Sequence, residues 1–89
     1  MEKWFVYLLY SPKVKKHYIG STNDLYRRLR DHNLGRSKFT SMANDWTIIH
    51  FDEYHTEHEA RSIEMRTKKN KKLRREFYLA SANTWHLVK

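Results

Sequence analysis

Three runs of hydrophobic residues along the chain have the patterns of β-strands. Residues 4–10 (Trp-Phe-Val-Tyr-Leu-Leu-Tyr) are apolar or aromatic almost without a break, which is typical of a strand covered on both faces. Residues 17–20 and 46–54 are rich in β-branched and aromatic side chains. A polar connection at 11–16 would join the first two strands as an antiparallel hairpin. The pattern therefore predicts a central first strand, with the second strand returning beside it.

Residues 23–34 have the spacing of an amphipathic helix. Asn23 or Thr22 is the expected N-cap, with Asp24 at the positive end of the helix dipole, and Gly35 is the expected C-terminal stop. Gly20, directly before this segment, is expected to make the structural turn between strand and helix. One stripe of the helix would hold Leu25, Leu29 and His32, with Arg28 on its flank.

A second helix is predicted from Thr56, where Thr56 at the N-cap and Glu59 form a capping box. This phase places Glu64 on the inward stripe, together with Ala60 and Thr67. A carboxylate there is either the structural partner of an arginine or a site residue. The helix either continues through the following basic stretch or breaks near Asn70.

These elements define the expected fold. We expect an α+β fold with a small three-stranded antiparallel sheet flanked by helices, forming a single domain over residues 1–89. Its core would span about 4–80, followed by a tail at 81–89. The segment 36–45 has no periodicity and is interpreted as a loop, with Phe39 and Met42 directed inward.

The net positive charge of the chain favours a polyanionic partner. The chain has 18 Lys and Arg residues against 10 Asp and Glu, a net charge of +8, and no cysteine. Nucleic acid is the favoured partner, and DNA in particular. A membrane surface is not favoured, because no helix has the broad apolar face of a membrane anchor. We expect a cytoplasmic monomer, with a protein partner as an open alternative. The predicted nucleic-acid-binding residues are Arg27, Arg36, Lys38, Lys68, Lys69, Lys71, Lys72, Arg74 and Arg75.

Several ordered motifs resemble the GIY-YIG nuclease family. Tyr7 ends a Phe-Val-Tyr segment, Tyr18 begins Tyr-Ile-Gly, and Arg28 follows on the first helix. A Glu-Ala pair then precedes Glu64 at the family spacing. The resemblance covers roughly residues 4–80. Within this family, the chain is similar to the N-terminal nuclease domain of the bacterial excision-repair nuclease.

The resemblance implies a set of catalytic roles. Tyr7, Tyr18, Arg28 and Glu64 would be catalytic, with one of the two tyrosines as the general base and His32 as a helper. Glu64 would be the ligand of one Mg²⁺ or Mn²⁺, since a hard oxygen ligand suits these ions. Arg28 can place two N–H donors on one phosphate.

The expected function is metal-dependent hydrolysis of DNA phosphodiester bonds, directed by DNA structure or damage rather than by sequence, as in repair or recombination. Two alternatives remain open. The first is a noncatalytic DNA- or RNA-binding module with the same fold, and the second is a subunit that cleaves only beside a partner. The inward Glu64 and the tyrosine pair favour catalysis, because pure binding does not require them.

Overall fold

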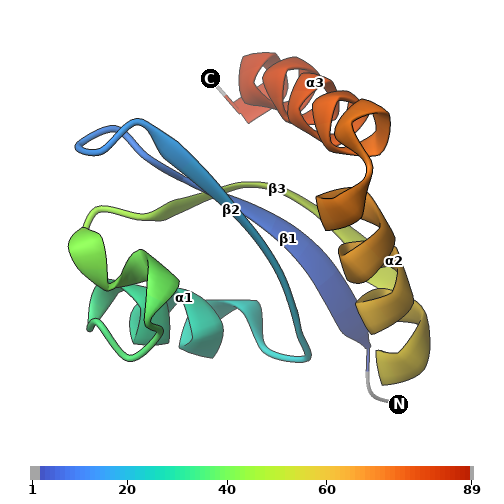
Figure 1. Ribbon diagram of the computed structural model, residues 1–89, viewed down its shortest axis with the longest axis horizontal. Coiled ribbons are helices and arrows are strands. Elements are labelled where there is room, and N and C mark those ends of the chain that lie inside the picture. The colour runs from blue at the N-terminus through green and yellow to red at the C-terminus, as the bar shows by residue number, and fades with distance from the viewer. Residues whose placement is uncertain (1–2, 89) are drawn as a thin grey trace.

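The computed structural model describes the backbone of residues 3–88 and the side chains of residues 3–80. It contains one antiparallel sheet with the strand order β2-β1-β3, formed by β1 (Trp4–Ser11), β2 (Lys16–Thr22) and β3 (Thr47–Tyr54) (Figure 1). The central position of β1 and its hairpin with β2 confirm the predicted α+β arrangement. In the β1–β2 register, Tyr7 lies opposite Gly20 and Leu9 opposite Tyr18.

Helices cover both faces of the sheet (Figure 1). Helix α1 (Leu25–Asn33) and the 3₁₀ helix η1 (Phe39–Met42) lie on one side. Helices α2 (Glu57–Lys69) and α3 (Lys71–Val88) lie on the other side. Within residues 3–88, the helices are too short or too polar to cross a membrane.

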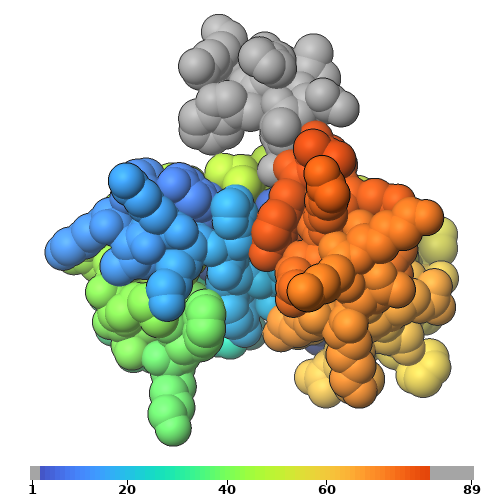
Figure 2. Space-filling model, turned by 45° about the horizontal axis from the view of Figure 1, so that its top comes forward, coloured from blue at the N-terminus to red at the C-terminus, as the bar shows by residue number. Residues whose placement is uncertain are grey.

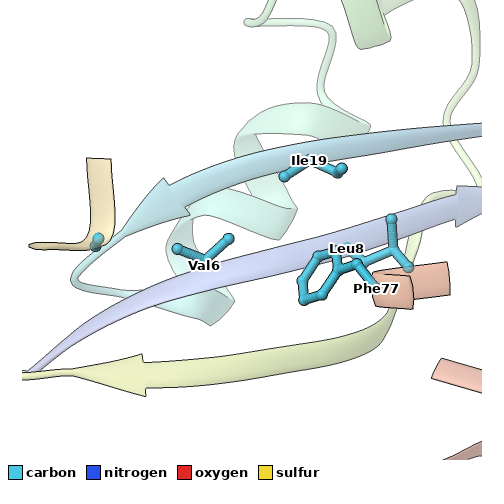
Figure 3. Close-up of a cluster of buried hydrophobic side chains, with 5 residues drawn as sticks. Val6, Leu8, Ile19 and Phe77 are labelled. Carbon is cyan, nitrogen blue, oxygen red and sulfur yellow. The ribbon is translucent and has the colours of Figure 1, made fainter. Parts of the chain in front are cut away.

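Alternation along β1 divides the buried side chains into two clusters. Val6 and Leu8 point toward α2 and α3, where they form a core with Ile19, Ala60 and Phe77 (Figure 3). Tyr7 and Leu9 point to the opposite face. There they form a second cluster, whose other members are Ala43 and Trp46, with Tyr18, Leu25 and Leu29 packed against it. The same alternation therefore directs Tyr7 to the α1 side and its neighbours to the α2 side.

The helix ends agree only in part with the predicted caps. Asp24, rather than Asn23 or Thr22, is the N-cap of α1, and its carboxylate accepts from the backbone N–H of Arg27 at 3.1 Å. Thr56 caps α2 as predicted, by accepting from the N–H of Glu59 at 3.1 Å. The Glu59 carboxylate bonds back to the N–H of His55 rather than to that of Thr56. Gly35 follows α1 with a φ of +76°, a conformation that favours glycine.

Asn70 separates α2 from α3. Its side-chain oxygen accepts from the N–H groups of Lys72 and Leu73 at 2.9 and 3.2 Å, which is an N-cap arrangement for α3. Of the two predicted outcomes, the helix therefore breaks near Asn70. The expected tail from residue 81 instead continues α3 as far as Val88, and residue 89 lies outside the described residues.

Two predictions about the first half of the chain are wrong. Gly20 makes no turn: it lies inside β2 and has no positive φ, because the hairpin strand continues to Thr22. Phe39 and Met42 are 49% and 43% exposed rather than inward. Thr40 and Ala43 are buried in their place, because η1 turns every third residue toward the sheet.

Candidate active site

A pocket of about 400 Å³ lies at β2, an edge strand of the sheet, and it brings together four of the five predicted catalytic residues, all but His32. Tyr7 and Tyr18 come from the two hairpin strands, Arg28 comes from α1, and Glu64 comes from α2. Ser21, Arg61, Met65 and Lys68 complete the lining. Figure 2 shows β2 in light blue, with the blue β1–β2 connection and the green segment around η1 on one side and the orange helices on the other. Because α1 and α2 cover opposite faces, their side chains meet only around this edge strand.

Gly20 makes room for Tyr7. The two residues are cross-strand partners, and a Cβ built on Gly20 would come within 2.6 Å of Tyr7 Cζ and 2.9 Å of Tyr18 Cε2. Real Cβ atoms do not approach other atoms so closely. The glycine therefore lets the Tyr7 ring lie flat across the neighbouring strand, with its hydroxyl directed to the sheet edge.

The Tyr7 hydroxyl is held by a buried chain of polar side chains. It lies 2.8 Å from His32 Nε2, and His32 Nδ1 lies 2.6 Å from Thr40 Oγ1. The Thr40 hydroxyl donates in turn to the carbonyl of Ser37 at 3.4 Å. We assign the chain so that each proton is used once: Tyr7 donates to Nε2, and Nδ1–H donates to Thr40. The Tyr7 oxygen then keeps its lone pairs for groups in the pocket, among them the Arg28 guanidinium.

His32 is fully buried and uncharged at neutral pH. Burial lowers its pKa from 6.5 to about 4, and the nearby Arg28 guanidinium adds to this effect, against a smaller opposing contribution from Asp31. An uncharged imidazole is what the assigned chain requires, because Nε2 must accept from Tyr7. The predicted helper residue thus contacts Tyr7 directly.

The Tyr7 hydroxyl is a neutral phenol in the protein without substrate. Burial raises its pKa well above the usual value of 10.0, and the neighbouring Tyr18 contributes in the same direction. Arg28 opposes this shift. Cationic charge in the pocket therefore favours the ionised form of Tyr7, and the further charge of a bound cation would act in the same direction.

Trp46 fixes the position of Thr40, although it lies outside the pocket. Its indole Nε1 donates to the Thr40 carbonyl at 2.8 Å. Its backbone exchanges two hydrogen bonds with the Asn33 side chain, at 2.8 and 3.0 Å. Since Trp46 is buried between α1 and η1, it holds the end of the hydrogen-bonded chain that begins at Tyr7.

Glu64 has partners other than the arginine considered from the sequence. Its Oε1 accepts from the Ser21 hydroxyl at 2.5 Å, and its Oε2 pairs with Lys68 Nζ at 2.7 Å. The side chain is 20% exposed, so it borders the pocket rather than being enclosed in the core. The alternative in which Glu64 is the structural partner of an arginine is therefore wrong for the described ion pairs.

Arg28 interacts with the hydroxyls of Tyr7 and Tyr18 and is only weakly paired with acidic side chains. Its only described ion pair, with Asp31, is long at 3.9 Å, whereas Asp31 makes a closer contact of 2.9 Å with Arg36. The guanidinium is 34% exposed and lines the pocket beside Tyr7. A planar group with several N–H donors in this position can bind two oxygens of one phosphate.

The donor set fits a weakly held divalent cation. Among the described residues there is no group of three His, Cys, Asp or Glu side chains that could hold a metal ion. Mg²⁺ commonly uses one or two carboxylates and completes its shell with water and substrate phosphate. Glu64 could supply that single carboxylate, once Lys68 moves away from Oε2.

The predicted nucleic-acid-binding residues divide into three groups. Lys68 lines the pocket, and Arg74 bonds to the carbonyl of Lys68 at 3.1 Å beside it. Arg36 is engaged with Asp31. The others are exposed on α1, before η1, at the end of α2 and on α3, and they do not line this pocket: Arg27, Lys38, Lys69, Lys71, Lys72 and Arg75.

Sequence reasoning missed three residues that support the site. Ser21 follows Tyr-Ile-Gly directly. Because neighbouring residues of a strand point to opposite faces, Ser21 lies on the α2 side of β2, and the sequence could have indicated this. Thr40 and Trp46 gave no such signal, because only the folded chain brings them to His32.

The arrangement of two strand tyrosines, a helix arginine and a helix glutamate is that of a nuclease-type fold. The chain belongs to the GIY-YIG family: the GIY-YIG catalytic domain matches residues 3–76. No solved structure matches the chain significantly.

Bacterial relatives carry the same domain. A UPF0213 protein of Bacillus velezensis is 35% identical over 63 residues, which is 70% of this chain and 64% of the relative. A UPF0213 protein of Listeria innocua is 35% identical over 65 residues, with 72% of each chain covered. The UPF0213 protein YazA of Bacillus subtilis is 33% identical over 63 residues, which is 70% of this chain and 64% of YazA. The match thus spans just under two thirds of two of these relatives.

Proposed function

We propose that the chain is an endonuclease that hydrolyses DNA phosphodiester bonds in the presence of Mg²⁺ or Mn²⁺. The observation that carries the proposal is the pocket at the edge of β2, where Tyr7, Arg28 and Glu64 converge from three different elements. A chain with a net charge of +8 suits a polyanionic substrate. Simple phosphate binding requires cations, but it does not require a buried phenol–imidazole chain beside a carboxylate.

In this proposal Arg28 binds the scissile phosphate through two N–H groups and stabilises the negative charge that grows on its oxygens. Tyr7 accepts a hydrogen bond from the attacking water, because its own proton is directed to His32. The water oxygen forms a bond to phosphorus, while the bond from phosphorus to the departing 3′ oxygen breaks. Tyr7 takes up the water proton as its own proton passes to His32 Nε2, and the 3′ oxygen takes up a proton from solvent.

Glu64 and the substrate phosphate would hold the cation. When bound, the cation would supply positive charge that offsets the charge developing on the phosphate and on the leaving oxygen. Ser21 orients Glu64 by donating to Oε1, which leaves Oε2 as the ligand atom. Lys68, which pairs with Oε2, could instead form an ion pair with a phosphate oxygen.

We further propose selectivity for DNA structure, such as branched, damaged or single-stranded DNA, rather than for sequence. Apart from Met65, the residues that line the pocket are of the kinds that bind phosphate or take part in hydrolysis. Phosphate contacts position a nucleic acid but carry no sequence information. This selectivity would suit a role in DNA repair or recombination.

One observation favours a second candidate, a noncatalytic nucleic-acid-binding module or a nuclease subunit that needs a partner. The ion pair between Lys68 and Glu64, at 2.7 Å, occupies the oxygen that a cation would use. If this pair persists in the presence of substrate, the chain would bind DNA without cleaving it.

The purified protein should be incubated with labelled single-stranded, duplex, flap and junction DNAs, and with RNA, in Mg²⁺, Mn²⁺ or EDTA. We expect cleavage of at least one DNA in the divalent cations, none in EDTA, and none by Glu64→Gln. Binding without cleavage of any substrate would favour the second candidate.

A further inference from the structure

A second pocket, of about 430 Å³, adjoins the proposed active site at the same edge of β2. The two pockets share Tyr18 and Lys68. The second pocket has aromatic rings and cations in its lining: His17, Tyr18, Phe39, Tyr78, Lys68 and Arg74. None of the functions derived above accounts for Phe39 or Tyr78.

The aromatic rings come from both sides of the edge strand. The rings of His17 and Tyr78 are stacked, with centroids 4.4 Å apart and an interplanar angle of 19°. The rings of Tyr18 and Phe39 lie 5.7 Å apart at 34°. The first pair joins α3 to β2, and the second pair joins η1 to β2. A flat ligand entering this pocket would therefore meet ring surfaces from two layers of the fold.

Packing of the core does not explain the position of Phe39. Its side chain is 49% exposed, although the buried positions of the same turn are taken by Thr40 and Ala43. A large exposed apolar ring next to a site is a feature of interaction surfaces. The His17–Tyr78 pair has a structural role in holding α3, so Phe39 is the more informative of these rings.

Two cations border the aromatic surfaces. Lys68 Nζ lies 5.2 Å from the centroid of the Tyr18 ring, and it also reaches Glu64. Arg74 is fixed by its bond to the carbonyl of Lys68. A ligand with a flat aromatic part and a neighbouring negative charge matches this combination, and a nucleotide has both parts.

We propose that this second pocket, the base pocket, binds an unpaired nucleobase next to the scissile phosphate, with Lys68 and Arg74 on the adjoining backbone phosphate. The inference deepens the proposed function and rests on it. A base within a duplex is stacked and paired, so only a base outside the helix can enter between these rings. The base pocket would thus select an unpaired strand at the cleavage position.

The test is a binding measurement in EDTA with the Glu64→Gln protein, so that cleavage plays no part. The probes are an oligothymidylate of about eight nucleotides, a fully abasic oligomer of the same length, and a duplex of the same length. We expect the oligothymidylate to bind about 5-fold to 100-fold more tightly than the abasic oligomer. The duplex, despite its higher charge, should bind more weakly than the oligothymidylate.

The added substitution Phe39→Leu should remove most of the difference between oligothymidylate and abasic oligomer, whereas Phe39→Trp should keep it. Tyr26→Leu is the matched control, because Tyr26 is 86% exposed on α1 and lies outside both pockets. Melting temperatures of the variants show whether weaker binding comes from unfolding.

Equal affinity for the oligothymidylate and the abasic oligomer, or equal effects of Phe39→Leu on both, would overturn the base pocket. That result would leave the proposed function intact if the protein still cleaves DNA. Conversely, base-dependent binding that requires Phe39, in a protein that cleaves nothing, would keep the base pocket and reject the nuclease.

Discussion

The hydroxyl of Tyr7 and Nε2 of His32 are joined by a buried hydrogen bond of 2.8 Å, between the central strand and the first helix. The other ring nitrogen of His32, Nδ1, is hydrogen-bonded to Thr40 Oγ1, so both nitrogens of the imidazole are held. This relationship makes His32 a positioning residue for Tyr7, and it also gives the protein a pH-dependent stability.

His32→Gln should flatten the dependence of stability on pH. The pKa of His32 is about 4 in the folded protein and near 6.5 in the unfolded chain, so between these values the unfolded state binds more protons. The contribution of the neutral His32 to the free energy of unfolding is complete above about pH 6.5. As the pH falls toward 4, this contribution decreases by at most about 3 kcal/mol. Urea unfolding at neutral pH and at about pH 4.5 measures the loss in both proteins. Equal losses would show that His32 does not titrate in this range.

Gly20→Ala should damage both stability and the site. The new Cβ would meet Tyr7 Cζ at 2.6 Å, so the ring must shift away from residue 20, which strains its hydrogen bond to His32, at a cost of roughly 1–3 kcal/mol. The control is Gly35→Ala, where the φ of +76° costs about 1 kcal/mol but the nearest atom, Ser41 Cβ, is 4.0 Å away. Cleavage assays on both variants, at matched fractions of folded protein, separate the effects. Activity retained in Gly20→Ala would refute the role given to Tyr7.

Arg28→Lys should lower turnover much more than DNA binding. Lysine keeps the charge but does not have the planar pair of donors that can bind two phosphate oxygens. We expect kcat to fall by about 100-fold or more, as for the removal of an oxyanion donor, with binding in EDTA changed only a few-fold. Steady-state kinetics and binding are measured on the same preparations. If lysine supports the wild-type rate, Arg28 contributes charge alone.

Glu64→Gln should remove the response to the cation while leaving the fold intact. The amide oxygen can still accept from Ser21, and the ion pair to Lys68 that the substitution removes is partly exposed, so stability should change by less than about 1 kcal/mol. In the wild-type protein with a short oligonucleotide, Mn²⁺ should raise the melting temperature and its EPR signal should report binding. Both effects should disappear in Glu64→Gln. Unchanged Mn²⁺ binding would place the cation elsewhere.

The exposed lysines on α2 and α3 should set the salt dependence of binding without affecting selectivity. Replacing Lys69, Lys71 and Lys72 by Ala should weaken binding to every DNA similarly. The slope of log K against log salt should fall by about 0.7–0.9 for each phosphate that the protein no longer neutralises. Titrations at several salt concentrations provide the slopes. An unchanged slope would show that these lysines do not bind phosphate.

The sequence by itself determined the three strands, helices α1 and α2, and the family. The continuous apolar run of β1, the Thr56–Glu59 cap and the ordered motifs are local signals, and local signals are readable because each depends on residues close together in the chain. The same local pattern put Glu64 and Thr67 on the inward side of α2, and Thr67 is buried. Motif spacing was also sufficient to name four of the residues that line the pocket, Tyr7, Tyr18, Arg28 and Glu64.

Only the tertiary structure decided what these residues contact. Gly20 was interpreted as a turn, yet its function follows from the ring of Tyr7 on the neighbouring strand. An arginine was one partner considered for Glu64, but the approach of α2 to β2 gives it Ser21 and Lys68. Phe39 is exposed because the turns of η1 bury Thr40 instead. Each of these outcomes depends on the relative position of two elements, which a one-dimensional pattern does not contain.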